Sequence, residues 1–234
     1  MTFFTMHFLL PLLAILAGIF IVIIIYHFLT KPIYLSAWRE REIRRLVQQV
    51  ETGQSAAIIG VFSPEKSAVL DYLRNEKIYD TQSCKLVLSY LDISDTIEKE
   101  CTLAQFWQYA LEPLQKEIAK NTNSVLSKIY QSCQENNFSN LFLEKLIEQM
   151  KQDNWQLVLL INRFEGLLHR PNLNQPDFFG GLRLLASSHY PSPISVIISL
   201  NQSITQFHKD TIKSNRFTLS QFFGVWRNYI RGII

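Results

Sequence analysis

The stretch Ser55-Ala-Ala-Ile-Ile-Gly60-Val-Phe-Ser-Pro-Glu65-Lys66-Ser67 decides the fold. An apolar strand, residues 56–59, runs directly into a sequence that follows the phosphate-binding pattern G-x-x-x-x-G-K-[ST] at all of its fixed positions but one. Glu65 stands where that pattern has its second glycine. A helix is predicted from Lys66 to about Asn75. Strand, loop and helix in this order are what a P-loop fold requires, so we interpret the segment as an altered phosphate-binding loop.

The altered position matters because successive backbone N–H groups of such a loop point at phosphate oxygens, and a glycine before the lysine lets the chain curl around them. Glu65 brings a Cβ and a negative charge to that point. Gly60, Lys66 and Ser67 remain as the candidate nucleotide-binding residues, with Lys66 as a point charge on the β- and γ-phosphates. The alternative is a surface lysine beside Glu65, in an ion pair that contributes little.

The rest of the chain alternates between predicted strands and predicted helices. Further strands are expected at residues 85–91, 155–161 and 194–200, and helices at residues 102–120, 125–134, 140–151 and 177–188. Thr102 and Gln105 have the spacing of a capping box, and Pro113 predicts a kink in the helix that follows. The near-continuous apolar run 155–161 is typical of a strand buried on both faces. We therefore predict an α/β protein with a doubly wound parallel sheet of the P-loop NTPase kind.

The first thirty residues contain no Lys, Arg, Asp or Glu, and the run from Phe8 to Tyr26 is almost wholly apolar. At about 1.5 Å per residue, such a helix crosses the roughly 30 Å of a bilayer's hydrocarbon core. A cleaved signal peptide needs a basic start and a shorter apolar run. A buried core helix is the other alternative. We predict a transmembrane anchor over residues 1–30, a juxtamembrane helix and linker over 31–54, and the P-loop-like domain over 55–234.

Charge predicts the orientation of this anchor. Five basic residues follow the apolar run and none precedes it: Lys31, Arg39, Arg41, Arg44 and Arg45. By the positive-inside rule, we expect a single-pass membrane protein whose C-terminal domain is cytoplasmic and which contacts lipid through the N-terminal helix. The formal net charge of +3 is too modest to indicate a nucleic-acid partner.

Cysteine and histidine give no sign of a metal site. The three cysteines, Cys84, Cys101 and Cys133, are odd in number and contain no C-x-x-C pair, so we expect reduced, buried thiols rather than a disulfide framework or a zinc site. The histidines are scattered and lack the spacing of a known metal-binding motif. We predict no metal ligands and no catalytic residues.

An active P-loop ATPase has a second motif, in which an apolar strand ends in an aspartate that orders Mg²⁺ and a glutamate that activates water. Here the strand 155–161 leads into Asn162 and Arg163. An amide lacks the negative charge of the aspartate, and an arginine cannot act as a general base at neutral pH. We therefore expect no conventional ATP hydrolysis. Glu165 as a substitute acid is the alternative, although we expect it to cap or solvate the next loop.

Three segments of the chain resemble bacterial signal-transduction ATPases with numerous domains, the STAND group of AAA-type P-loop proteins. They are residues 101–114, residues 155–169 and residues 177–188, within a resemblance that spans about residues 55 to 205. In that group the third strand ends in an Asp-Glu-Phe-Asp pattern, where this chain has Asn162 and Arg163. Members also carry Ser-Arg after the later strand, where this chain has Ser199-Leu200-Asn201. The resemblance implies a P-loop ATPase fold with degenerate catalytic motifs.

These observations favour a membrane-anchored pseudo-ATPase, not an enzyme, that serves as scaffold or regulatory subunit of a protein assembly on the cytoplasmic face. We expect a protein partner or a homo-oligomer, no resident cofactor, and ATP without Mg²⁺ as the candidate ligand. Two alternatives stay open: an ATP-binding signalling switch with weak or trans-completed hydrolysis, and a structural subunit of a large membrane complex. The aromatic stretch 217–234 is expected either to pack as a last helix or to dock on a partner or a membrane.

Overall fold

The computed structural model describes residues 37–59, 63–79, 84–121, 124–187 and 192–202, together with Gln206 and Lys209. The chain divides into two units, Met1–Glu40 and Arg41–Ile234. The first unit is described only over residues 37–40, which begin helix α2 (Ala37–Glu51). The predicted anchor over residues 1–30 and the aromatic stretch 217–234 lie outside the described residues. Of the helices that are described, none has the length and hydropathy needed to cross a membrane.

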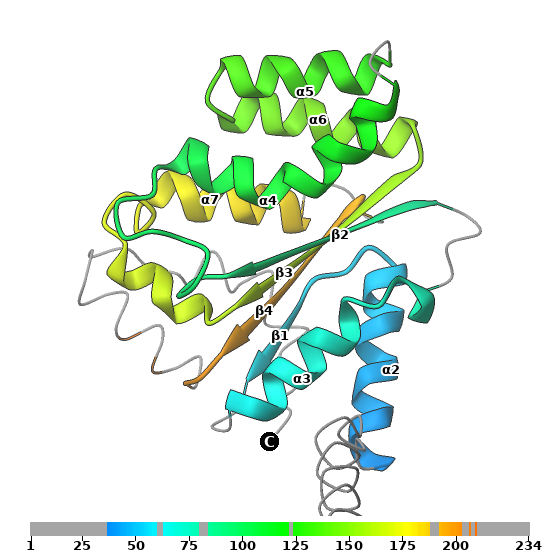
Figure 1. Ribbon diagram of the computed structural model, residues 1–234, viewed down its shortest axis with the longest axis vertical. Helices are drawn as coiled ribbons and strands as arrows, with labels where there is room; N and C mark the ends of the chain where they lie inside the picture. Colours follow the sequence, from blue (N-terminus) through cyan, green and yellow to red (C-terminus); the bar gives the residue numbers. More distant parts are fainter. Residues whose placement is uncertain are drawn as a thin grey trace, which may run out of the picture. The chain divides into compact units, whose positions relative to one another are not determined.

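Four parallel strands form one sheet in the second unit. They are β1 (Ala56–Ile59), β2 (Lys85–Asp92), β3 (Trp155–Asn162) and β4 (Ile194–Leu200). Their order across the sheet is β1-β4-β3-β2, so β4 separates β1 from β3 (Figure 1). The register pairs Ile59 with Leu200 and Asp92 with Asn162, which brings the carboxyl ends of the strands to one edge. The predicted α/β fold with a parallel sheet of the P-loop kind is confirmed.

Helices connect the strands at nearly the predicted positions. They are α3 (Ser63–Leu73), α4 (Leu103–Ile118), α5 (Val125–Glu135), α6 (Asn140–Gln152) and α7 (Pro176–Ser187), with short 3₁₀ helices η1 (Glu76–Ile78), η2 (Ala119–Asn121) and η3 (Phe164–His169). The capping box of Thr102 and Gln105 is confirmed, and α4 continues through Pro113. The predicted start of α3 at Lys66 was wrong: the helix begins at Ser63, because a proline such as Pro64 is tolerated in a first helical turn.

The helices cover both faces of the sheet. Helices α4 to α7 lie on one face, and α2 and α3 lie on the other (Figure 1). On the first face, the hydroxyl of Ser89 in β2 donates to the carbonyl oxygen of Ala110 in α4, at 2.7 Å. On the second, the hydroxyl of Ser195 in β4 donates to the carbonyl oxygen of Val50 in α2, at 3.3 Å. A sheet covered on both faces explains why β4 is buried along its whole length.

The core on the α4–α7 side is built around aromatic rings. The ring of Phe106 meets the ring of Phe178 edge to face, with centroids 4.8 Å apart, and meets the indole of Trp107 in the same way at 5.2 Å. Phe179 and Phe164 extend the group towards η3. All five side chains are at most 1% exposed. This packing ties α4 and α7 together and holds the segment that follows β3 in a fixed position.

Gly166 in η3 leaves no room for a side chain. A Cβ added there would lie 2.9 Å from Cγ2 of Ile93, which is fully buried. We expect Gly166→Ala to lower the free energy of unfolding by about 1–3 kcal/mol, because the added methyl overpacks a closed contact. Gly180, in α7, is the matched control. Its Cβ would meet only Asn140, at 4.0 Å, so Gly180→Ala should stabilise the protein by roughly 0.5–1 kcal/mol. Urea unfolding of the two variants checks this, and equal shifts would contradict it.

Candidate functional site

The predicted nucleotide-binding residues fall at the junction of β1 and α3. Gly60 lies outside the described residues. Lys66 and Ser67 lie in the first two turns of α3, and their side chains are likewise outside the described part of the chain. What the structure gives is the backbone order of strand, connection and helix at the carboxyl edge of the sheet. Assignment of these three residues to a phosphate site stays a prediction.

Three buried polar side chains meet at the same edge, each from the end of a different strand. The amide nitrogen of Asn162 donates to Oδ2 of Asp92 at 2.8 Å, and the hydroxyl of Ser199 donates to Oδ1 of Asn162 at 2.6 Å. Asn162 also reaches the hydroxyl oxygen of Tyr90 at 3.3 Å. Asp92 and Asn162 are each 6% exposed, and Ser199 is 1% exposed. We call Asp92, Asn162 and Ser199, together with Arg163, the strand-end network.

Arg163 completes the network from a left-handed backbone conformation, with φ of 55°. Its backbone N–H donates to the hydroxyl of Ser199 at 3.1 Å. Its guanidinium donates from Nε and Nη2 to Oδ2 of Asp92, at 3.1 and 2.7 Å, and from Nη2 to Oδ2 of Asp95, at 2.6 Å. Both carboxylates belong to β2 or to the turn that follows it. The side chain of Arg163 therefore points towards β2. Since β3 and β4 lie between β2 and β1, it points away from the end of β1, where the predicted phosphate loop begins.

The electrostatics of the network favour its charged form. Burial alone raises the pKa of Asp92, but hydrogen bonds from Arg163, Asn162 and the Ser94 backbone N–H outweigh it and hold that pKa below its usual 3.8. The same contact acts in reverse on the guanidinium: the hydrogen bond to Asp92 raises the pKa of Arg163. Asp92 and Arg163 are therefore an ion pair at neutral pH.

The lowered pKa of Asp92 predicts a pH dependence. Unfolding restores the ordinary pKa of 3.8, so the unfolded chain binds the proton first, and the stability that ionised Asp92 contributes is complete above that pH. It is lost as the pH falls below 3.8 through the lower pKa of the folded state. The difference in free energy of unfolding between wild type and Asp92→Asn should therefore shrink on acidification from pH 7 to pH 3. Urea titrations across that range test this, and a constant difference would contradict it.

Glu165 lies on the other side of β3 from the ion pair. Its carboxylate accepts hydrogen bonds from the backbone N–H and the side-chain amide of Asn201, the residue after β4. Since Leu200 is level with Ile59 of β1, this contact lies beside the strand that leads into the predicted phosphate loop. Glu165 was expected to cap or solvate the next loop; the bonds found here go instead to the residue after β4. Leu200, at the position where the resemblance to the STAND group predicts an arginine, is fully buried.

Arg170 fastens the turn that follows β2 to the segment that follows β3. Its guanidinium donates to the carbonyl oxygens of Ile97, at 3.0 and 2.6 Å, and of Gly166, at 2.7 Å. A further hydrogen bond goes to the carbonyl oxygen of Ile93. Burial lowers the pKa of Arg170 from its usual value. Because Asp95 lies between Ile93 and Ile97, this clamp fixes one partner of Arg163.

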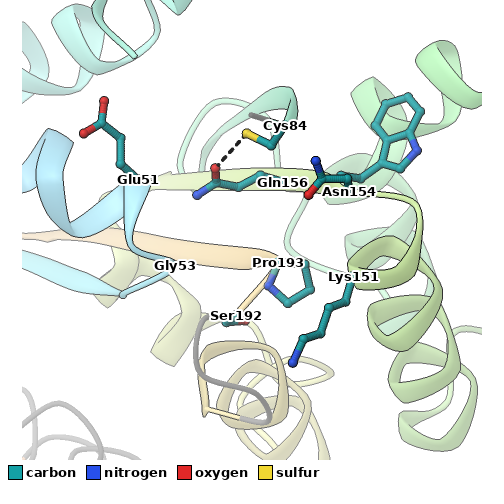
Figure 2. Close-up of a pocket in the computed structure, with 9 residues that line it drawn as sticks. Glu51, Gly53, Cys84, Lys151, Asn154, Gln156, Ser192 and Pro193 are labelled. Atoms are coloured by element: carbon teal, nitrogen blue, oxygen red, sulfur yellow. Dashed lines mark hydrogen bonds between the residues drawn. The ribbon is translucent and has the colours of Figure 1, made fainter. Parts of the chain in front are cut away.

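A cavity of about 400 Å³ lies at the opposite edge of the sheet, where the strands begin (Figure 2). It is lined by Glu51, Gly53, Cys84, Lys151, Asn154, Trp155, Gln156, Ser192 and Pro193. The thiol of Cys84 donates to Oε1 of Gln156 at 3.3 Å. Cys84 is only partly buried, so the prediction of a buried thiol was wrong for it, whereas Cys101 and Cys133 are buried. β3 has eight residues, about 26 Å at roughly 3.3 Å per residue, which separates this cavity from the strand-end network.

Sequence reasoning identified Asn162, Arg163 and Glu165 but missed Asp92, Ser199 and Arg170 as parts of the same constellation. A usable signal existed for Asp92, because ligands of open α/β sheets bind outside the carboxyl ends of the strands and Asp92 ends β2. No group of three or more His, Cys, Asp or Glu in the described ranges is arranged to hold a metal. The arrangement supplies hydrogen bonds and two ion pairs, of Arg163 with Asp92 and with Asp95, and directs the guanidinium of Arg163 towards β2.

Neither the known family models nor the curated proteins include a match to this sequence. Among solved structures, the Aeropyrum pernix ORC2 protein, in complexes with ADPNP and ADP, is similar with a TM-score of 0.50 at 12% identity, over 82% of this chain and 46% of that one. A Walker-type ATPase of Pyrococcus abyssi reaches 0.46 at 17% identity, over 76% and 49%. The Aeropyrum pernix ORC1 protein in complex with DNA reaches 0.45 at 13% identity, over 80% and 49%.

The likeness to the ORC2 protein gives this chain the fold of the AAA+ P-loop ATPases. At 12% identity it is a statement about the fold alone. The chain spans about half the length of each of these three solved proteins.

Proposed function

We propose that this chain is a membrane-anchored pseudo-ATPase that serves as a scaffold or regulatory subunit of a protein assembly on the cytoplasmic face of a membrane. The AAA+ fold supports it as the starting point. The observation that carries it is the state of the two positions where an active relative has its metal-ordering aspartate and its catalytic glutamate. Asn162 and Arg163 stand there, and both are bound into the strand-end network.

The chemistry of these two side chains supports the loss of catalysis. The amide of Asn162 carries no charge, and its nitrogen is directed at Asp92, at 2.8 Å. The guanidinium of Arg163 is paired with Asp92 and Asp95 on the far side of β3 from β1. A general base must reach the proton that it removes, and an arginine holds its own proton at neutral pH. At these two positions the chain therefore offers neither a charge to order Mg²⁺ nor a base to activate water.

The finer parts of the proposal rest on the sequence. The apolar run from Phe8 to Tyr26, followed by basic residues, supports an anchor whose C-terminal domain is cytoplasmic. The segments 101–114, 155–169 and 177–188 support a relationship to the STAND group. A fold that is kept while its catalytic positions are lost is best explained by use of its surface, so we expect a protein partner or a homo-oligomer.

Steady-state ATP hydrolysis by the purified full chain tests the proposal. With Mg²⁺ present, wild type and Lys66→Ala should release phosphate at the same background rate, because the protein contributes no catalysis. Lys66→Ala is the matched control, since it removes the cation of the altered phosphate loop and leaves any contaminating ATPase unchanged. Turnover by wild type that Lys66→Ala abolishes would contradict the proposal.

A second candidate function is an ATP-binding switch, and the contact of Glu165 with Asn201 favours it. This polar pair lies at the end of β4, next to β1, on the side of β3 where a nucleotide on the phosphate loop would be found. Thermal stabilisation of the full chain by ATP, lost in Lys66→Ala, would support the switch, because a ligand that binds only the folded state raises its apparent stability. Identical melting of the two proteins with and without ATP would reject it.

A further inference from the structure

The orientation of the Asn162 side chain is set by its neighbours. Its nitrogen donates to Oδ2 of Asp92 at 2.8 Å and approaches the hydroxyl oxygen of Tyr90 at 3.3 Å. Its oxygen accepts from the hydroxyl of Ser199 at 2.6 Å. Each side of the amide therefore has a partner of the correct kind. With both Asn162 and Asp92 at 6% exposure, water cannot easily replace a partner that is lost.

A carboxylate at position 162 would suit all of these neighbours but one. The hydroxyl of Ser199 already donates towards this position, and the hydroxyl of Tyr90 can rotate to donate as well. Asp92 is the exception, because a carboxylate oxygen in place of the amide nitrogen would lie about 2.8 Å from its Oδ2. Two carboxylates that close cannot both stay ionised in a buried site.

We propose that Asp92 excludes an aspartate from position 162, and that the two side chains form an exchangeable pair of one amide and one carboxylate. The metal-ordering aspartate of an active relative is thus incompatible with this chain as long as Asp92 ends β2. Arg163 strengthens the exclusion, since its guanidinium keeps Asp92 ionised. This inference rests on the proposed function and deepens it. It gives a physical reason why replacing Asn162 alone with aspartate does not restore a metal-ordering carboxylate.

The charges around the pair come from several elements. Arg163 follows β3, Asp95 lies in the turn after β2, and Arg74, which follows α3, stacks on the ring of Tyr90 with 4.4 Å to its centroid. Asp71 of α3 also acts on the Tyr90 hydroxyl. In Asn162→Asp one of the two carboxylates should have a raised pKa, so the penalty should lessen as the pH falls below that value. Acid should thus reduce the destabilisation caused by Asn162→Asp, whereas in the wild type acid removes the stability that ionised Asp92 contributes.

Four full-length chains form the test: wild type, Asp92→Asn, Asn162→Asp and the exchanged pair D92N/N162D. Urea unfolding followed by tryptophan fluorescence, at pH 7 and pH 4.5 and with EDTA to keep cations from bridging two carboxylates, gives the unfolding equilibrium of each. At pH 7, Asn162→Asp should shift the equilibrium towards the unfolded state by more than tenfold. In the Asp92→Asn background the same substitution should cost much less, and at pH 4.5 the single variant should recover part of its loss.

Equal costs of Asn162→Asp in the two backgrounds would overturn the proposal, because the effects would then be independent. So would failure of both Asn162→Asp and the exchanged pair to fold. If only the single variant fails to fold at pH 7, rescue by Asp92→Asn supports the proposal. The test does not depend on ATP turnover, so the pair can prove exchangeable even if the wild-type chain hydrolyses ATP, and the two ideas fail separately.

Discussion

Replacing Asp92 with alanine is expected to lower the free energy of unfolding by about 3 kcal/mol, because removing one partner of a buried, hydrogen-bonded charge pair leaves the other uncompensated. The carboxylate accepts from Arg163, from Asn162 and from the backbone N–H of Ser94, at 2.9 Å. Its side chain is 8% exposed, whereas that of Arg163 is 34% exposed, so water offsets part of the loss. Urea unfolding of the full chain measures the effect.

Asp95→Ala is the matched control, since Asp95 binds the same guanidinium nitrogen at 2.6 Å but has a side chain that is 71% exposed. An exposed ion pair contributes at most about 1 kcal/mol. Asp95→Ala should therefore cost less than a third of what Asp92→Ala costs. Equal losses in the two variants would show that burial does not set the strength of the network.

Replacing Arg170 with methionine is the second large expected effect. Methionine is shorter than arginine but keeps much of its apolar stem, and it leaves the carbonyl oxygens of Ile93, Ile97 and Gly166 without their donor. An unsatisfied buried polar group costs about 1–3 kcal/mol, and water can reach part of this site, so we expect a loss of about 3 kcal/mol in total. Arg170→Lys should recover less than half of it, because one ammonium cannot reproduce the planar fork of donors.

Arg183 offers a control for the arginine-to-methionine change. It lies on the exposed side of α7, where water screens the interactions of its guanidinium, so Arg183→Met should change the free energy of unfolding by less than about 1 kcal/mol. The clamp can also be followed without denaturant. Amide hydrogen exchange in residues 93–97 should quicken in Arg170→Met, because the turn loses its fastening. Unchanged exchange there, together with a small loss of stability, would show that Arg170 is not the residue that holds the turn.

The fold was predictable because local signals agreed with one another. The apolar runs at 155–161 and 194–200 marked strands buried on both faces, and the structure has strands at Trp155–Asn162 and Ile194–Leu200. Helix starts were predictable where a cap was visible, as at Thr102. The start of α3 was placed three residues too late, although Ser63-Pro64 is a pair typical of helix starts. The strand order was not predicted, since periodicity reports which residues are buried but not which strands are neighbours.

Only the site residues that occupy motif positions could be predicted from the sequence. Asn162 and Arg163 were identified because they occupy motif positions, but their partners come from residues about seventy and thirty-seven positions away. Asp92 followed a strand without belonging to any motif, and Ser199 was noted only because the arginine expected after it is missing. Arg170 gave no local signal at all, since its partners are backbone carbonyls. Such contacts are set by the register of parallel strands, which sequence pattern alone does not determine.

The most direct test of the central claim, that catalysis is lost while the AAA+ fold is kept, is a single-turnover experiment. The full chain is held in excess over radiolabelled ATP with Mg²⁺, so that even one slow event per protein molecule is detected, and Lys66→Ala is run beside it. The account predicts that label stays in ATP to the same extent with both proteins. Release of stoichiometric labelled phosphate by wild type, absent in Lys66→Ala, would contradict it.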